Sequence, residues 1–422
     1  MVDSREGKLL QTVEELSDDI IDFSSRLIAE PSILGNEHSV LRVAETEFRH
    51  LEYNPKKIFI DPQELSKKPE FAPVPWDYDG RYNIVSVRPA DGKGGKSALF
   101  NGHLDVVSPE PLNQWSRDPF TPYIENGWLY GRGSGDMKSG VAAMTYAVKA
   151  IDKAGFGLAA PVTLETVIEE ECSGNGALAC RVQGIDADAV LIPEPFGPTI
   201  LTAQVGVCWF KVSLVGSPSH VLSTQSGVNA IEKSFVLIAA LRKLEAQLNS
   251  HSHPAYVDIQ HPINLNVGGI SGGDWPSTVP ADAEVKCRLA FFPGTSFTEI
   301  QSLIKQTIFD AADKDEWLSR NLPTVEFYGF RSEGHQVDAD LPAFKLLSGC
   351  QQDLTGKAAL QFISTCTTDL RSFIQFSKAQ ATCFGPVAEN IHASDERVNL
   401  ASVIHTAKVY ALFLARWCKL VE

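Results

Sequence analysis

The first half of the chain alternates short apolar stretches with segments of helical pattern. Apolar stretches typical of buried strands occupy residues 98–107, 162–168 and 189–192. Between them, residues 137–151 are rich in good helix formers, and residues 177–184 also have a helical pattern. Strand–helix alternation of this kind predicts an α/β layer fold with a mainly parallel sheet.

The pattern changes near Gly206, where strands begin to alternate between apolar and polar residues. The elements predicted beyond this point are a half-exposed strand at 207–216, a helix at 228–248, a strand at 283–292 and a helix at 297–314. We therefore expect residues 207–322 to form an inserted α+β domain. Residues 1–206 and 323–422 would form the discontinuous domain around it.

Both ends of the chain have helical patterns, an amphipathic one at 1–20 and an apolar one at 401–420. The first residues include acids and have no apolar core of the signal-peptide type. No apolar run approaches the roughly 20 residues that span a bilayer. The eight cysteines form no CxxC pair. A chain of 422 residues does not need disulfides, so we expect a cytoplasmic protein with reduced cysteines.

The net charge of -15 limits the kinds of molecule that the protein can bind. Nucleic acids and anionic membranes both require a basic surface, so neither is expected to bind.

Potential metal ligands follow the predicted strands of the first half. His103 and Asp105 end the first strand, residues 169–171 form a run of three glutamates after the second, and Glu194 follows the third. Asp136 lies in GRGSGD, a Gly-rich turn that opens a helix. Ligand crevices of open α/β sheets lie outside the carboxyl ends of the strands, so these side chains should converge.

One imidazole with several carboxylates suits a divalent cation such as zinc. Two such ions would also convert the repulsion within the glutamate run into attraction. Phosphate binding at GRGSGD is the alternative, but the turn does not fit the GxxxxGK[ST] spacing. A serine hydrolase would require G-x-S-x-G, and Ser134 is off by one position.

Five motifs occur in order along almost the whole chain: NGHLDVV, WSRDPFTPYIENGWLYGRGSGDMKSG, EEECSGNG, PEP and IHASDE. Together they resemble the M20 family of metal-dependent amidohydrolases and peptidases. The chain is most similar to the branch that contains acetylornithine deacetylase and succinyl-diaminopimelate desuccinylase. This resemblance implies a zinc-hydrolase catalytic domain with an inserted lid or dimerisation domain.

The resemblance also implies a site for two divalent ions, zinc first, with cobalt or manganese as alternatives. His103 and Glu194 would hold one ion, Glu171 and His392 would hold the other, and Asp136 would bridge them. The peptide bond that follows Asp136 is expected to be cis.

Roles for the neighbouring acids follow from the same resemblance. Glu170 would be the general base, and Asp105 would hydrogen-bond the far nitrogen of His103. Strict strand alternation would put Glu169 and Glu171 on one face and Glu170 on the other, so the turn at Gly174 is expected to break the alternation. No role is assigned to Glu169.

In the inserted block, GSPSHVLSTQSGVNAI matches a family stretch whose histidine stabilises the oxyanion, often from the other subunit of a dimer. That residue is His220, so a homodimer is expected. Arg288 and Arg371 match arginines that bind substrate, although an exposed structural arginine is an equal alternative for Arg371. Ser277 stands where many members have a substrate-contacting asparagine.

The first hypothesis is therefore deacylation of an N-acyl amino acid, with acetyl favoured. A dipeptidase or carboxypeptidase that uses the same metals is the rival. A non-catalytic binding protein on the same fold is the alternative of another class.

Overall fold

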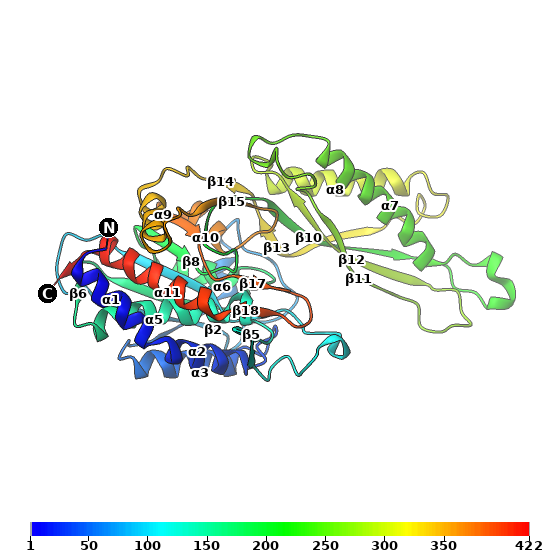
Figure 1. Cartoon of the computed structure of the whole chain (residues 1–422). Helices are drawn as coiled ribbons and strands as arrows, with labels where there is room; N and C mark the ends of the chain where they lie inside the picture. The colour runs from blue at the N-terminus through cyan, green and yellow to red at the C-terminus, as the bar shows by residue number, and fades with distance from the viewer. Residues whose placement is uncertain (1, 422) are drawn as a thin grey trace.

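The computed structural model describes residues 2–421 and shows a larger body from which a second unit projects (Figure 1). The body contains a six-stranded sheet in the order β1-β2-β7-β3-β8-β16. Its strands are β1 (Lys56–Phe59), β2 (Tyr82–Arg88), β7 (Val162–Val167), β3 (Ala98–His103), β8 (Ala189–Ile192) and β16 (Gln380–Cys383). The last four are parallel, whereas β2 is antiparallel to both of its neighbours. The predicted α/β fold with a mainly parallel sheet is confirmed.

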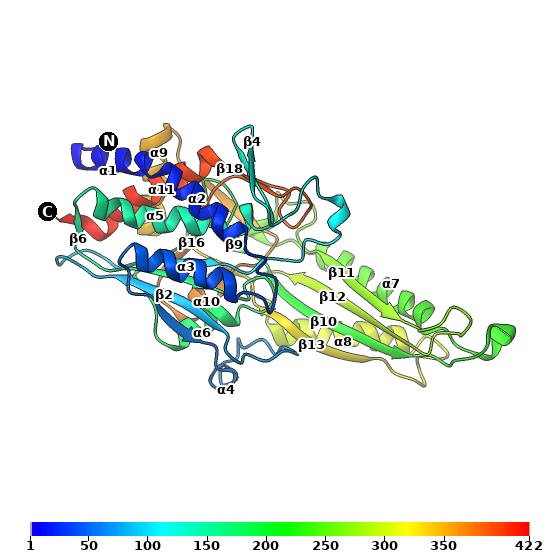
Figure 2. The ribbon, with the colours of Figure 1, turned by 90° about the horizontal axis from the view of Figure 1, so that it is seen from below.

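Helices cover both faces of this sheet, which explains why β3, β7 and β8 are buried along their whole length. One face carries α1 (Ser4–Glu15), α2 (Ser17–Ile28), α3 (His38–His50), α5 (Ser139–Lys153) and α11 (Leu400–Leu414) (Figure 2). The other face carries α6 (Asn175–Val182) and α10 (Leu370–Phe376). The remaining helices of the body are α4 (Pro62–Leu65) and α9 (Pro342–Thr355). The N-terminal segment forms two helices rather than one, with a break at Leu16.

The projecting unit is a four-stranded antiparallel sheet with both of its long helices on one face (Figures 1 and 2). The order β11-β12-β10-β13 comprises β11 (Leu265–Gly272), β12 (Asp282–Phe291), β10 (Gly206–Val215) and β13 (Thr324–Ser332), and the helices are α7 (Ala230–Asn249) and α8 (Phe297–Ala312). β10 alternates between buried and partly exposed residues because only one face is covered. The strand β13 lies beyond the expected boundary at residue 322, so we propose that the inserted unit ends near Ser332.

Three smaller sheets join segments that are far apart in the chain. The first has β9 (Thr199–Gln204) between β14 (His335–Gln336) and β15 (Leu360–Ser364). The second has the order β17 (Ala388–Glu389), β18 (Arg397–Asn399), β5 (Trp128–Tyr130) and β4 (Tyr123–Glu125). The third pairs β6 (Gly157–Leu158) with β19 (Leu420–Val421). The pairing of β18 with β5 brings the loop after β17 beside the turn that contains Asp136. Within residues 2–421, no helix is both long and apolar enough to cross a bilayer.

Candidate active site

Five predicted metal ligands converge at the carboxyl ends of the central strands. His103 ends β3, Glu194 follows β8 and Glu171 follows β7. Asp136 lies in the kinked helical turn Ser134–Lys138, and His392 lies in the loop between β17 and β18. The imidazole Nε2 of His103 is 3.1 Å from Asp136 Oδ1. The Nε2 atom of His392 is 3.1 Å from Glu171 Oε1 and 3.4 Å from Asp136 Oδ2. The Asp136 carboxylate therefore lies between the two imidazoles, with one oxygen toward each.

These donor atoms form two overlapping groups that could each hold a metal ion. The ligand atoms of His103, Asp136 and Glu171 lie within 4.8 Å of one another, and so do those of His103, Glu170 and Glu194. The peptide bond between Asp136 and Met137 is cis, as expected. The loop geometry thus places both imidazoles and four carboxylates around one small volume.

The carboxylates create a strongly negative potential at this place. The Glu171 carboxylate, against the effect of burial, raises the pKa of His392 to about 11. Burial opposes protonation of His103, but the hydrogen bond to Asp136 and the nearby acids outweigh it and raise the pKa of His103 well above its usual range. A site that attracts protons this strongly also attracts divalent cations, which take the same imidazole and carboxylate atoms.

The Glu170 carboxylate is buried and lacks a hydrogen-bond partner at Oε1 within the described residues. Burial raises the pKa of Glu170 well above its usual range, although His103 acts in the opposite direction. A buried polar atom without a partner is costly, so it calls for a ligand or water in that position.

The side chain of Glu169 does not join the metal ligands, because the backbone turns at this residue. Its φ angle is +68°, in the left-handed region, and this turn breaks the strand alternation. The carboxylate is fully buried and accepts hydrogen bonds from Trp76 Nε1 (2.6 Å), the Tyr78 hydroxyl (2.6 Å), the Arg81 guanidinium and the Ser173 hydroxyl. Glu169 is thus an anchor that fixes the turn on which Glu170 and Glu171 lie.

Asp105 makes contacts that differ from the expected ones. The main-chain carbonyl of Asp105, and not its carboxylate, is the hydrogen-bond partner of His103 Nδ1 at 2.9 Å. The carboxylate is 3.8 Å from Nδ1 and instead accepts the main-chain N–H groups of Glu170 (3.2 Å) and Glu171 (3.1 Å). The carboxylate turns this way because the N–H groups after Glu169 have no strand partner. Asp105 therefore supports both the imidazole and the glutamate turn.

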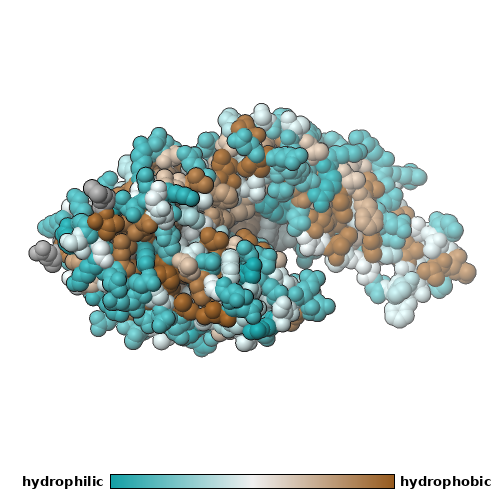
Figure 3. Space-filling model, viewed as in Figure 1, coloured by the Kyte–Doolittle hydropathy of each residue, from teal (hydrophilic) through white to brown (hydrophobic). Residues whose placement is uncertain are grey.

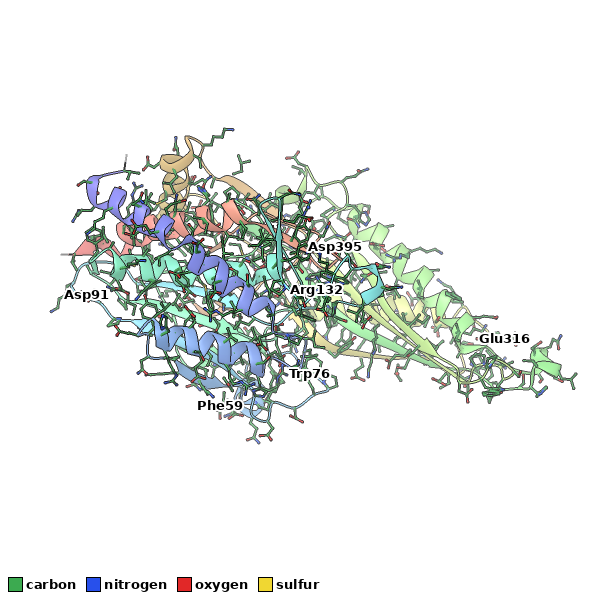
Figure 4. The ribbon with its side chains drawn as sticks, turned by 60° about the horizontal axis from the view of Figure 1, so that its bottom comes forward. Phe59, Trp76, Asp91, Arg132, Glu316 and Asp395 are labelled. Atoms are coloured by element: carbon green, nitrogen blue, oxygen red, sulfur yellow. The ribbon has the colours of Figure 1, made fainter. Side chains whose placement is uncertain are left out.

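Glu396, for which the strand and helix patterns predict no role, holds the turn that carries Asp136. Its buried carboxylate accepts the N–H groups of Gly133 (3.1 Å), Gly135 (2.8 Å) and Asp136 (3.0 Å), and pairs with Arg132 at 2.6 Å. Arg132 lies near the junction of the two units (Figure 4). The only sequence signal for Glu396 is its position at the end of the IHASDE motif.

A cavity of about 450 Å³ lies between these acids and the inserted unit. Glu170, Glu171 and His392 line it from the body, and Arg288 lines it from β12. Figure 3 shows that the surface is hollowed where the two units meet. The site is therefore a two-sided cleft with charged groups at its floor.

Arg371, His220 and Ser277 are not among the described residues that line this cavity. Arg371 is buried beneath the Phe330 ring, with its guanidinium carbon 4.6 Å from the ring centroid. A side chain at Gly174 would collide with the same guanidinium. In one chain, Arg371 therefore supports the cavity wall instead of reaching into the cavity.

His220 and Ser277 lie next to each other at the surface of the inserted unit. His220 is exposed, and its Nδ1 accepts the N–H of Leu222 at 3.1 Å. Ser277 is also exposed, and its carbonyl accepts the N–H of Val221. Neither contact involves the acids of the body.

Comparison with known proteins agrees with this site. Residues 99–416 match the profile of peptidase family M20/M25/M40. The chain belongs to this family. The relatives include amide-bond hydrolases, a deformylase and a deacetylase, so this chain is an enzyme of the amide-bond-hydrolase class.

Two sequence relatives and one solved structure show which proteins the chain is similar to. A Bacillus subtilis N-formyl-4-amino-5-aminomethyl-2-methylpyrimidine deformylase is 27% identical over 365 residues, 81% of this chain and 85% of that protein. A Proteus mirabilis acetylornithine deacetylase is 29% identical over 352 residues, 83% and 86% of the two chains. The structure of a Saccharomyces cerevisiae dipeptidase, 16% identical, covers 99% of both chains with a TM-score of 0.79 and shows the shared fold.

Replacing Glu169 with glutamine should destabilise the protein without removing a metal ligand. The change leaves part of the buried Arg81 charge uncompensated, and breaking a buried pair costs about 3 kcal/mol or more. Urea unfolding of the metal-free protein would measure the loss. Glu316→Gln is the control, because Glu316 is exposed at the far end of the inserted unit (Figure 4) and should cost less than about 0.5 kcal/mol. Equal losses in the two variants would contradict the anchoring role.

Replacing Glu396 with alanine should weaken metal binding, because three N–H groups of the Asp136 loop lose their acceptor. Outer supports of a metal site are typically worth about 10–100-fold in affinity. Competition with a chromogenic zinc chelator measures this affinity independently of turnover. Glu389→Ala is the matched control, since Glu389 lies on the same hairpin but forms only an exposed pair with Arg397. Unchanged zinc affinity in Glu396→Ala would remove Glu396 from this role.

Proposed function

We propose that this enzyme hydrolyses the amide bond of N-acyl amino acids at a site for two divalent metal ions. The single observation that carries the proposal is the position of Asp136, with one carboxylate oxygen toward each of two imidazoles. That arrangement supports a bridging carboxylate between two ions. Two-metal hydrolysis is the chemistry that such a site serves.

The donor set passes a test of fit for divalent cations. It offers two imidazoles, His103 and His392, and the carboxylates of Asp136, Glu171 and Glu194, which suit zinc, with cobalt or manganese as alternatives. His103 and Glu194 would hold one ion, and Glu171 and His392 the other. Divalent ions in such a site lower the pKa of water and polarise an amide carbonyl.

Glu170 is the general base of the proposal. Glu170 lines the cavity, and its buried Oε1 atom has no protein partner within residues 2–421. It would take a proton from the attacking water and deliver it to the leaving amine. The raised pKa that burial gives Glu170 suits a group that must hold the proton between these two steps.

His220 would donate a hydrogen bond to the oxyanion from a second copy of the chain. Its exposure and its absence from the cavity lining of one chain support this assignment. The Leu222 N–H occupies Nδ1, so Nε2 is the nitrogen that can donate. Removal of one oxyanion donor typically lowers turnover by about 10²–10³-fold. The active form would then be a homodimer.

The proposal also concerns which acyl group and which amine the substrate contains. A deformylase and a deacetylase among the relatives support small acyl groups. The partly buried Arg288 in the cavity wall supports a substrate with a carboxylate, because its guanidinium donates only to main-chain carbonyls, of Asn264 and Thr365, and has no acidic partner among the described residues. A dipeptide would satisfy the same arginine, so a peptidase is the rival within the family.

A substrate panel tests this proposal. The protein would be stripped with a chelator and restored with zinc, cobalt or manganese. Free amine release would then be measured from N-acetyl, N-succinyl and N-formyl amino acids and from dipeptides. We expect metal-dependent release from N-acyl amino acids, with the N-acetyl compounds cleaved best. Cleavage of the dipeptides alone would establish the peptidase instead.

A second prediction concerns the two proposed catalytic side chains. Glu170→Gln and His220→Ala should each lose most activity, about 10²–10⁴-fold for the general base. If His220 comes from a partner, mixing the two variants under subunit exchange should restore about a quarter of the parent activity, because half of the dimers are mixed and each carries one complete site.

Metal content is the control for this experiment. Glu170→Gln should retain the same zinc per chain as the parent protein. Zinc loss in Glu170→Gln would mean that Glu170 is a ligand, as its proximity to His103 and Glu194 permits. No recovery on mixing, in dimers shown to exchange, would place His220 outside the partner's site.

A further inference from the structure

One row of cross-strand neighbours forms the wall of the cavity that faces the metal ligands. Asn266 on β11 pairs with Arg288 on β12, and Arg288 pairs with Trp209 on β10. Tyr328 and Phe330 on β13 lie beside Trp209, and all five side chains line the cavity. Their face of the sheet is the one that the helices α7 and α8 leave uncovered (Figure 2).

Trp209 is held in place from two sides. Its ring meets Phe330 edge-on at 5.1 Å and Tyr328 at 6.0 Å. A β-bulge interrupts the β10–β13 pairing here, and Gly329 has a φ of +60°. A Cβ at Gly329 would lie 2.7 Å from the indole ring, so only glycine allows the ring to lie against β13. Behind Phe330 lies the Arg371 guanidinium. The wall is therefore a rigid aromatic surface.

The charged side chains of the wall that line the cavity are basic, and the Glu284 carboxylate, which lies 3.7 Å from the Lys286 ammonium, is outside the cavity lining. Lys286 and Arg288 line the cavity from β12, next to the aromatic surface. Among the described residues, the only acids that line the cavity are Glu170 and Glu171. Both belong to the proposed metal and base cluster, so neither is available to a side chain at the wall. A cationic substrate side chain would meet lysine, arginine or an apolar ring there.

From this arrangement we infer that the enzyme prefers N-acyl amino acids with an aromatic side chain and discriminates against cationic ones such as N-acetylornithine. The inference rests on the proposed function and names its substrate class. Arg288 holds the substrate carboxylate, and the ring of the substrate stacks against Trp209. Lys286 repels an ammonium group.

The spacing of these groups matches an aromatic α-amino acid. Arg288 and Trp209 are direct partners in adjacent strands, and the Cα atoms of such partners are about 5 Å apart. Their side chains therefore present a cation and an aromatic surface next to each other. In an aromatic amino acid, the carboxylate and the ring are likewise separated by only two carbon atoms.

The decisive measurement is kcat/KM of the metal-loaded enzyme for N-acetylphenylalanine and N-acetylornithine. We expect the aromatic substrate to be favoured by roughly tenfold or more, in the range that one apolar or charged contact supplies. Trp209→Ala should lower this ratio by roughly tenfold, mainly through KM. Phe59→Ala is the matched control, because Phe59 is an exposed aromatic residue on β1, outside the cavity (Figure 4), and should leave the ratio unchanged.

Lys286→Glu gives an independent test, because Lys286 is exposed and its replacement does not threaten folding. The new carboxylate should raise kcat/KM for N-acetylornithine, relative to N-acetylphenylalanine, by roughly tenfold. A parent enzyme that cleaves N-acetylornithine at least as well as N-acetylphenylalanine would overturn the inference and leave the proposed function standing.

If neither compound is cleaved, the substrate panel decides on the proposed function, and binding alone then tests the wall. Calorimetric titration of metal-loaded Glu170→Gln with the two compounds separates affinity from turnover. Tighter binding of N-acetylphenylalanine would support the aromatic site even without hydrolysis. Equal or tighter binding of N-acetylornithine would refute it.

Discussion

The structure depends on how it accommodates a concentration of negative charge. Asp105, Asp136, Glu194 and the glutamates at 169–171 all lie where the parallel strands end. Two like charges 4 Å apart repel by about 4 kcal/mol near a protein surface. Partners that offset this repulsion therefore decide how such a cluster is held in a folded protein.

The partners divide these acids into two groups. Glu169 is satisfied by a guanidinium and three neutral donors, Asp105 by two N–H groups, and Glu396 by three N–H groups and Arg132. The second group comprises the acids beside the imidazoles, and Glu170, whose Oε1 has no partner among residues 2–421. The first group makes the loops rigid, so the second is held together where divalent cations would neutralise it. The acids that are not metal ligands therefore hold the proposed metal ligands in position.

The sequence predicted the parts of the fold that follow from periodicity. Strands β3, β7 and β8 are continuous apolar runs because they are buried on both faces, and α7 and α8 have clear helical spacing. The segment LNVGGISG of β11 has four exposed positions and three glycines, so it lacks an apolar pattern that would mark it as a strand. Its place depends on pairing with β12, which only the assembled sheet provides.

The candidate site was likewise predictable only in part from the sequence. Strand ends indicated where His103 and Glu194 lie, and the motifs of the family indicated His392 at a distance of almost 300 residues. Neither source indicated that Glu169 takes a positive φ, because that conformation is enforced by the buried partners of its carboxylate. Arg371 was assigned to the substrate by motif, whereas its environment is decided by Gly174 and Phe330, which come from other elements.

The two sides of the cavity obey different physical constraints, and this difference bears on how substrate choice can vary. The floor is constrained by charge: replacement of any one acid there disturbs the balance of the others. The wall is constrained mainly by the shape of a few side chains on one sheet face, such as Trp209 and Lys286, whose replacement leaves every proposed metal ligand in place. Relatives named for a formyl and an acetyl group, at 27% and 29% identity, are compatible with a retained floor and a changing wall. Because the wall belongs to the inserted unit and the floor to the body, a change in the position of the unit alters the fit of the substrate without altering the ligands of the metals.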